Sequence, residues 1–357
     1  MYVTFDNMPR RVTIQDIADE MGLSRNTVSK AINSTGIIAE STRSAILKKA
    51  AEMGYKLFAI QQTAETENSD PEKKELVIIT GSALGGSHFS ASMLDEMQGE
   101  ASHLGYGFTM YRVMTKEREE LKLPANFDTK RVAGIFCVEM FDTAYSHMLC
   151  SLGLPIVFID TAVMFEEKPL AADVLLMENR SGIYALVREM VARGKTEIGF
   201  IGEKLHCMSF YERYEAYMGA LRLFNLEFNP EWCLTGSSRG LDYPPHDNYL
   251  NYLEENMTSC KTLPSVILCA NDFVAMDVIQ VLKKMGISVP NGIYLCGFDD
   301  SPESRIITPN LTTIHINGKS MGRAAIDLLF SRIKNPSAPF RTVYIESNIV
   351  YRESTEN

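Results

Sequence analysis

The hydrophobic residues of this chain follow two different periods, one in the first sixty residues and another in the rest. From Val12 to Tyr55 they recur every three or four positions, as on one face of short helices. After residue 75 they form short apolar runs bounded by turn residues, each followed by a segment of helical period. The predicted strands are 76–80, 107–113, 132–138, 155–160, 197–202, 265–270 and 293–300. The predicted helices between them include 93–104, 182–193, 211–224 and 273–285.

Continuous apolar strands that alternate with helices are typical of parallel sheets covered on both faces. The pattern therefore predicts an α/β fold with parallel doubly wound sheets, and the number of strands favours two lobes. Residues 61–74 have a single alanine, Ala64, as their only hydrophobic side chain and contain a proline, so they cannot pack a core. We expect a helical headpiece at 1–60, a linker or hinge at 61–75 and a two-lobed domain at 76–357.

The headpiece pattern predicts three short helices with a tight turn between the first two. Thr13 is placed to cap the first helix together with Asp16, and Gly22 is free to take the positive φ that the turn requires. Ser24 is placed to cap the second helix, and the third is expected at about 41–53, ended by Gly54. The expected inward side chains are Ile14, Ile17, Ala18, Met21, Val28, Ala31, Ile32, Ala45, Ile46, Ala50 and Met53.

The second helix leaves Arg25, Asn26, Thr27 and Lys30 facing outward. Arginine and lysine can bind guanine O6 and N7, asparagine can pair with adenine, and short hydroxyls reach phosphates. In a helix-turn-helix the start of the second helix enters the major groove of DNA. The pattern favours DNA reading, and a plain three-helix bundle with a polar surface is the alternative.

The same stretch resembles the headpiece of the lactose-repressor (LacI/GalR) family. The resemblance rests on Val12–Ala18, Gly22-Leu23-Ser24, Thr27-Val28-Ser29, Ile32-Asn33, Thr42-Arg43 and Gly54-Tyr55. It implies that Arg25, Asn26 and Lys30 read bases. It also implies that the residues that hold the DNA backbone are Ser24, Thr27, Ser29, Asn33 and Thr42, to which we add Thr13.

The segment after the headpiece departs from the family. Residues 56–64 lack the usual asparagine and the Ala-Arg-x-Leu pattern, and Ala64 stands where the family has a leucine that wedges into the minor groove. We expect less DNA bending, or another wedge such as Leu57 or Ile60. The alternative is that Leu57, Phe58 and Ile60 pack against the third helix.

Polar residues stand where the predicted strands end, which is where α/β sheets place their ligand sites. They are Asp160, the pair Asn271-Asp272 and the pair Asp299-Asp300. Such side chains suit a ligand rich in hydroxyl groups, and Arg213 could hold an oxygen or a carboxylate. An aspartate after a strand is also often a helix N-cap, an alternative for Asp272 and the favoured one for Asp300.

The body resembles the same family over nearly its whole length. The resemblance rests on 153–157 before Asp160, 194–202, Ser209 with Arg213, 270–272, 297–300, 309–314 and 352–355. It implies a two-lobed fold like type I periplasmic binding proteins, with Asp160, Arg213, Asn271 and Asp299 contacting an effector. Two departures are Glu178 in place of aspartate and Ala216 in place of glycine. Phe89 and Phe273 are further candidates to stack on a sugar ring, with core packing as their alternative.

Composition limits the classes of function. With 45% hydrophobic and 22% charged residues, no membrane-length apolar run and no signal-like N-terminus, the sequence predicts a globular cytoplasmic protein. The net charge of −10 divides unevenly. Residues 1–60 hold eight basic and six acidic residues, hence +2, and the remaining 27 basic and 39 acidic residues give −12. Phosphates are therefore attracted at one end only.

No motif supports an enzyme, a metal site or a cofactor. GxSxG, P-loop and HExxH patterns are absent, and the six histidines show no ligand spacing. The seven scattered cysteines are expected to be reduced and mostly buried. We expect a homodimeric transcription regulator, a repressor, that binds a pseudo-palindromic operator and senses a sugar or sugar derivative. A pure binding protein, an enzyme and a constitutive DNA-bending protein remain as alternatives.

Overall fold

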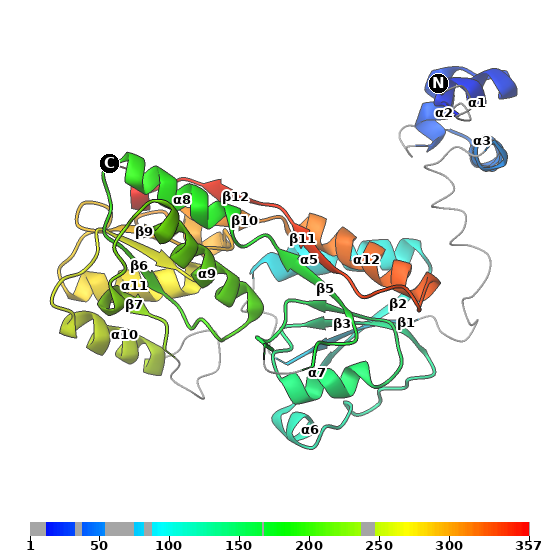
Figure 1. Cartoon of the computed structure of the whole chain (residues 1–357). Coiled ribbons are helices and arrows are strands. Elements are labelled where there is room, and N and C mark those ends of the chain that lie inside the picture. Colours follow the sequence, from blue (N-terminus) through cyan, green and yellow to red (C-terminus); the bar gives the residue numbers. More distant parts are fainter. Residues whose placement is uncertain are drawn as a thin grey trace, which may run out of the picture. The chain divides into compact units, whose positions relative to one another are not determined.

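A computed structural model describes residues 12–32, 38–53, 75–81, 88–165, 168–236 and 247–356. The chain divides into two compact units, Met1–Pro71 and Glu72–Asn357 (Figure 1). Within the described ranges, none of the helices combines the length and apolar character that crossing a bilayer would demand. The predicted hinge and its apolar residues, Leu57, Phe58, Ile60 and Ala64, lie outside the described residues.

The first unit contains the three predicted helices, α1 (Ile14–Met21), α2 (Arg25–Ile32) and α3 (Glu40–Glu52). The predicted caps are confirmed: Thr13 and Asp16 form a capping box, and Gly22 has a φ of 65°. Ser24 Oγ accepts a hydrogen bond of 3.1 Å from the amide of Thr27, as a capping side chain does. The completely or almost completely buried side chains are Ile17, Ala18, Val28, Ala31, Ile46 and Ala50.

One predicted inward residue of the first unit is wrong. Ala45 is exposed, whereas Ile46 and Ala50 are buried and Met53 packs partly against them. Positions 46, 50 and 53 follow the spacing of one helix face, and residue 45 is turned about 100° away from it because a helix has 3.6 residues per turn. Gly54, predicted to end the helix, lies outside the described residues.

The second unit is built on two parallel sheets. The first has the order β11-β5-β4-β3-β1-β2, and the second has the order β7-β6-β8-β9. The first sheet consists of β1 (Glu75–Thr80), β2 (Gly107–Arg112), β3 (Val132–Val138), β4 (Ile156–Ile159), β5 (Asp173–Met177) and β11 (Thr342–Ile345). The second consists of β6 (Ile198–Ile201), β7 (Cys233–Leu234), β8 (Val266–Cys269) and β9 (Tyr294–Cys296). The α/β fold with parallel sheets is as the sequence predicts.

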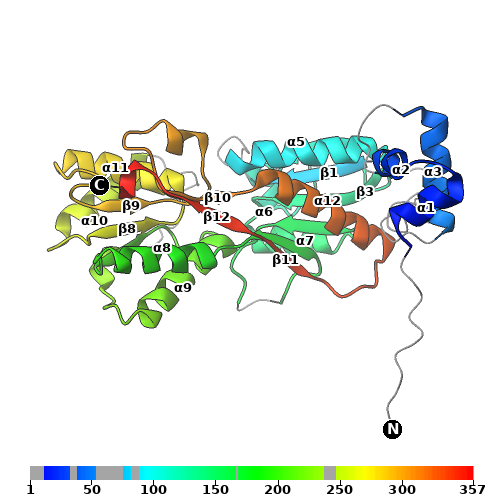
Figure 2. The ribbon, with the colours of Figure 1, turned by 90° about the horizontal axis from the view of Figure 1, so that it is seen from above.

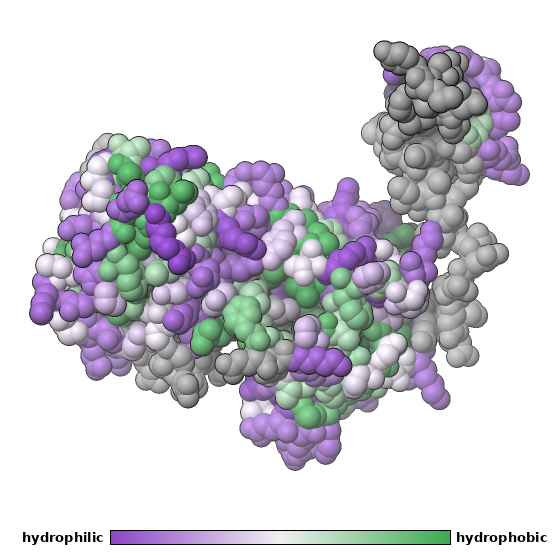
Figure 3. All heavy atoms as spheres, viewed as in Figure 1, coloured by the Kyte–Doolittle hydropathy of each residue, from purple (hydrophilic) through white to green (hydrophobic). Residues whose placement is uncertain are grey.

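Helices separate these strands along the chain and complete two lobes, one around each sheet (Figures 1 and 2). Lobe 1 has α5 (His88–His103), α6 (Thr115–Glu119), α7 (Thr143–Cys150) and α12 (Gly318–Lys334). Lobe 2 has α8 (Ser181–Ala192), α9 (Met208–Leu223), α10 (Asp247–Ser259), α11 (Asp272–Lys284), η2 (Pro230–Trp232), η3 (Pro302–Arg305) and η4 (Glu353–Thr355). Hydrophilic and hydrophobic residues are interspersed over the face seen in Figure 3.

Three described segments carry the chain between the lobes: residues 178–180 after β5, residue 317 before α12 and residue 346 after β11. Alongside them, β10 (Thr313–Ile316) and β12 (Ser347–Val350) pair as an antiparallel ribbon (Figure 2). The amide of Glu178 donates to the carbonyl of Ile345 over 2.7 Å, and Ser347 Oγ donates to the carbonyl of Glu178 over 2.6 Å. The first and third crossings are therefore tied directly to each other.

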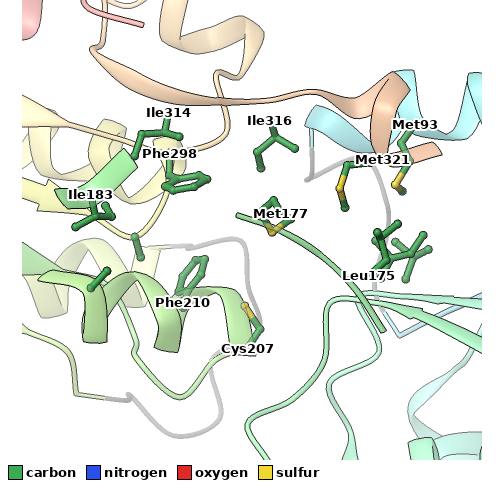
Figure 4. Packing of buried hydrophobic residues seen from close by; sticks show 14 of the residues in the cluster. Met93, Leu175, Met177, Ile183, Cys207, Phe210, Phe298, Ile314, Ile316 and Met321 are labelled. Carbon is green, nitrogen blue, oxygen red and sulfur yellow. The ribbon is translucent and has the colours of Figure 1, made fainter. Parts of the chain in front are cut away.

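A single cluster of buried hydrophobic residues extends from one lobe to the other. Figure 4 shows Phe298 and Phe210 on the side of lobe 2, Leu175 on the side of lobe 1, and Met177 and Ile316 between them. Because apolar burial is the main favourable term in folding, this shared core stabilises the lobes as one unit.

Asp173 anchors the returning C-terminal strand to lobe 1. Its carboxylate is fully buried and accepts two hydrogen bonds from Arg332 of α12, at 2.9 and 3.0 Å. It also accepts one of 2.8 Å from the amide of Arg341, just before β11. Burial opposes ionisation, but the hydrogen bonds from Arg332 and Arg341 outweigh it and hold the pKa of Asp173 below its usual value.

Asp173→Ala is expected to lower the free energy of unfolding by about 3–5 kcal/mol, because it leaves the guanidinium of Arg332 buried without its partner. Denaturant unfolding of the full chain measures this loss. Asp95→Ala is the matched control, because Asp95 is exposed on α5, and it should change stability by no more than about 0.5 kcal/mol. Equal small losses in both variants would contradict the anchoring role.

Candidate functional site

The structure brings three of the predicted effector residues together between the lobes. Asp160 follows β4 of lobe 1, Asp299 follows β9 of lobe 2, and Arg213 lies on α9. Arg213 Nη1 lies 3.5 Å from Asp299 Oδ1, and Asp160 Oδ1 accepts a 3.3 Å hydrogen bond from the amide of Ser209, one turn before Arg213. The carboxyl ends of strands from both sheets thus meet at one site, as expected for ligand sites in α/β folds.

Arg213 is the centre of this site. Its side chain is only 2% exposed, and its guanidinium carbon lies 3.5 Å from the centroid of the Phe298 ring. Nε donates to Asn179 Oδ1 over 3.0 Å, and Nη1 donates to the carbonyl of Ala270 over 2.6 Å. These contacts fix the orientation of a planar donor group that suits oxygen ligands. The sequence analysis singled out neither Asn179 nor Phe298, although Phe298 lies in the stretch 297–300 that resembles the family.

Asn271 caps a helix in this structure. It is 4% exposed beside Ala270, and its Oδ1 accepts a 3.0 Å hydrogen bond from the amide of Val274. It is therefore the N-cap of α11.

The aspartates Asp272 and Asp300 are not helix caps, so that alternative is wrong for both. Asp272 accepts hydrogen bonds from Thr313 Oγ1 at 2.6 Å and from the amide of Ser301 at 2.7 Å. Burial raises the pKa of Asp272 to about 8. The cap of η3 is Ser301. Each aspartate stands one residue away from the residue that does cap its helix, Asn271 for α11 and Ser301 for η3. A cap side chain must accept from an amide two or three residues ahead, and a shift of one position prevents this.

Asp300 instead joins two arginines and a histidine. It pairs with Arg305 at 2.7 Å, with Arg352 and with His315 Nδ1 at 3.0 Å. This cluster links η3, β10 and the C-terminal segment, which is a structural role.

The carboxylates near Arg213 are electrostatically unusual. Burial raises the pKa of Asp299 to about 6; the cation of Arg213 opposes the rise, whereas Glu139 and Asp160 add to it. Burial also raises the pKa of Asp160, against hydrogen bonds that favour its charged form. With a pKa of about 6, Asp299 is partly protonated near that pH, and its protonated form can donate as well as accept a hydrogen bond.

Glu139 is a residue that the sequence reasoning missed. It follows β3, and its φ is 50°, while φ is 62° at Asp160 and 111° at Asp299. Residues other than glycine rarely adopt positive φ, at a cost of about 1–3 kcal/mol each, and such residues cluster at functional sites. All three acidic residues of the site thus have this backbone conformation.

Aromatic rings from both lobes meet beside these groups. Phe141, after β3, packs against His206 with ring centroids 5.1 Å apart, and His206 packs against Phe210 at 5.1 Å. Burial lowers the pKa of His206 to about 4, so the ring is neutral at pH 7. The predicted stacking residue Phe273 is half-buried on α11, and Phe89 lies on α5 with its side chain outside the described residues.

The predicted DNA-reading residues lie on the first unit, mostly on α2. Arg25, Asn26 and Lys30 are exposed. Ser24 and Thr13 are also exposed, and both side chains cap helices. The half-buried side chains are those of Thr27, Ser29 and Thr42. Asn33 lies outside the described residues. An exposed cationic and amide face at the start of α2 can hydrogen-bond base edges.

The described residues contain no cluster of histidine, cysteine and carboxylate groups that could hold a metal ion. All seven cysteines are free, and four of them are buried: Cys137, Cys207, Cys269 and Cys296.

Two family descriptions match the chain. "Bacterial regulatory proteins, lacI family" covers residues 13–56, and "Periplasmic binding protein-like domain" covers residues 187–355. The HTH-type transcriptional repressor PurR of Mannheimia succiniciproducens is 26% identical over 349 residues, which are 96% of this chain and 98% of the relative.

Two solved structures resemble the chain over almost its whole length. The transcriptional regulator CelR–cellobiose complex superposes with a TM-score of 0.66 at 20% identity, covering 96% of this chain and 100% of that one. The lac repressor dimer bound to operator and the anti-inducer ONPF gives 0.62 at 20% identity, covering 98% and 100%. At such identities the likeness establishes the fold.

Asp299→Asn is expected to flatten the pH dependence of stability. The folded-state pKa of about 6 lies above the unfolded value, so the folded protein loses stability as pH rises between these values. The variant should lose less stability than the native chain between about pH 4 and pH 7, measured by denaturant unfolding. Asp95→Asn is the exposed control and should follow the native profile. Parallel profiles for Asp299→Asn and the native chain would contradict the assignment.

Proposed function

Because the chain belongs to the lacI family of bacterial regulatory proteins, we propose that it is a cytoplasmic transcriptional repressor whose operator affinity depends on a small polar effector. The observation that carries the proposal is the buried guanidinium of Arg213, held against Asp299 at the meeting edge of two sheets. The family consists of regulatory proteins, so the body acts as a sensor and not as an enzyme.

The proposed DNA-binding residues are those of α2 and its surroundings. Arg25, Asn26 and Lys30 read base edges in the major groove, since all three are exposed at the start or along the face of α2. The contacts to the DNA backbone come from Thr13, Ser24, Thr27, Ser29, Asn33 and Thr42. The proposed domain limits are 1–60 for the headpiece, 61–75 for the linker and 76–357 for the effector-binding and dimerisation domain.

The proposed effector is a sugar or a sugar derivative that binds Asp160, Arg213, Asn271 and Asp299. These groups offer both acceptors and donors, as a ligand with many hydroxyl groups requires. The carboxylates outnumber the one guanidinium beside them, which disfavours phosphorylated and acidic sugars. The structurally similar CelR is described in complex with cellobiose, which supports this ligand class.

The proposed active form is a homodimer on a pseudo-palindromic operator. One small headpiece makes few contacts, and two linked headpieces gain from effective concentration. The similar lac repressor is described as a dimer bound to operator, which supports this arrangement.

Arg25→Ala is expected to weaken binding to the cognate operator by about 10- to 100-fold, the loss of one good base contact. Binding to unrelated DNA should weaken much less, and fluorescence anisotropy at fixed salt measures both. Lys284→Ala is the control for removing a positive charge, because Lys284 is exposed on α11 and pairs with Glu254. The base-reading role fails if Arg25→Ala and Lys284→Ala bind the operator equally well.

A thermal-shift screen with neutral sugars, sugar phosphates, sugar acids and nucleobases tests the effector class. A compound at 100 times its Kd should stabilise the protein by about 2.7 kcal/mol. We expect the strongest shift from a neutral sugar, and its loss in Asp160→Ala. A nucleobase as the strongest hit would overturn the proposed class, and a sugar phosphate or sugar acid would overturn the preference for neutral sugars.

A further inference from the structure

A chain of hydrogen bonds runs from Arg213 to the strands that cross between the lobes. Arg213 Nε donates to Asn179 Oδ1 over 3.0 Å, and Asn179 Nδ2 donates to Glu212 Oε2 over 2.8 Å. The second oxygen of Glu212 accepts a hydrogen bond of 2.7 Å from the hydroxyl of Tyr344. Three bonds therefore connect the candidate effector site with β11, the last strand of lobe 1.

The interior of this chain is shielded from water. Asn179 is completely buried, and Glu212 is 8% exposed. Hydrogen bonds at such sites are electrostatically stronger than in water, and a lost partner leaves a costly unpaired group. The network therefore favours one arrangement of all its members over partly broken ones.

The members of the chain sit on both sides of the crossings. Asn179 lies in the first crossing, Glu212 lies on α9 of lobe 2, and Tyr344 lies in β11 of lobe 1, two residues before the third crossing. Arg180, also in the first crossing, reinforces the link: its Nη2 lies 3.2 Å from Glu212 Oε1, and its guanidinium lies 5.8 Å from the centroid of the Tyr344 ring. The bond between Tyr344 and Glu212 thus joins the two lobes beside the segments about which they would rotate.

We propose that Glu212 and Tyr344 are positioning residues that couple the orientation of Arg213 to the angle between the lobes. A ligand that holds Arg213 favours the intact chain of bonds, and the intact chain favours the lobe angle seen here. A change of that angle separates Tyr344 from Glu212 and releases Asn179, which loosens Arg213. The response to an effector rests on the proposed function, whereas the coupling between Arg213 and Tyr344 does not.

The effect on regulation is tested with Tyr344→Phe, which removes one hydroxyl and keeps the ring. The measured quantity is the ratio of operator affinities with and without the best neutral sugar of the screen. We expect this ratio, of the order of 5- to 150-fold for typical allosteric coupling, to fall to about a third or less. By linkage, the effect of operator DNA on sugar affinity should fall by the same factor.

Tyr351→Phe is the matched control. Tyr351 has a similar exposure, 38% against 40% for Tyr344, and it too lies beside an arginine, Arg193, at 5.8 Å. It should keep the full ratio. If Tyr344→Phe also keeps the full ratio, the coupling is overturned while the proposed function stands.

A second measurement needs no effector. No hydrogen bond joins Tyr344 directly to Arg213, so a purely local role predicts that Tyr344→Phe and Arg213→Lys act independently on unfolding. We expect the unfolding equilibrium constant of the double variant to differ from the product of the single effects by more than about threefold. For the control pair, Tyr351→Phe with Arg213→Lys, the effect of the double variant on the unfolding equilibrium constant should equal the product of the two single effects. Independent effects in both pairs would overturn the network, whereas a chain that responds to no ligand overturns only the proposed function.

Discussion

The burial of one guanidinium between two sheets is the constraint on which the sensor depends. Arg213 is almost entirely removed from water, so its donors and its charge need partners. The fold supplies a carboxylate, a backbone carbonyl, an amide oxygen and the face of Phe298. Asn179 lies in the first crossing and Ala270 directly follows β8. Phe298 and Asp299 lie in the segment that follows β9. The side chain of Arg213 thereby fixes the positions of these segments relative to one another.

The same constraint explains the electrostatics around Arg213. Acidic residues with positive φ follow β3, β4 and β9, and burial opposes the ionisation of two of them, Asp160 and Asp299, whose pKa values are raised. A buried carboxyl group on a backbone with positive φ lowers the stability of the fold, and such residues are common at sites that bind ligands. Asp173 shows the opposite balance, because its paired arginines lower its pKa and make it an anchor for the fold.

The headpiece follows simpler rules. A capping box, a glycine turn and a second cap determine where α1 and α2 begin and end, and an apolar stripe packs them against α3. The polar face of α2 is what remains on the outside, which is why a short sequence can specify both the fold and a DNA-reading surface.

The sequence by itself determined the parallel α/β class, seven of the strands, the caps of the headpiece and the acidic residues at the strand ends, because all of these depend on local periodicity and on neighbours a few residues away. It misplaced Ala45, favoured a cap role for Asp300, left one open for Asp272, and did not select Glu139 or Phe298. It also missed β5, β7, β10, β11 and β12, which are two to five residues long. Only the tertiary structure decided which residues surround Arg213 and how Glu212 and Tyr344 connect them to the crossings. The reason is that those contacts join residues 33 to 132 positions apart, and periodicity carries no information over such separations.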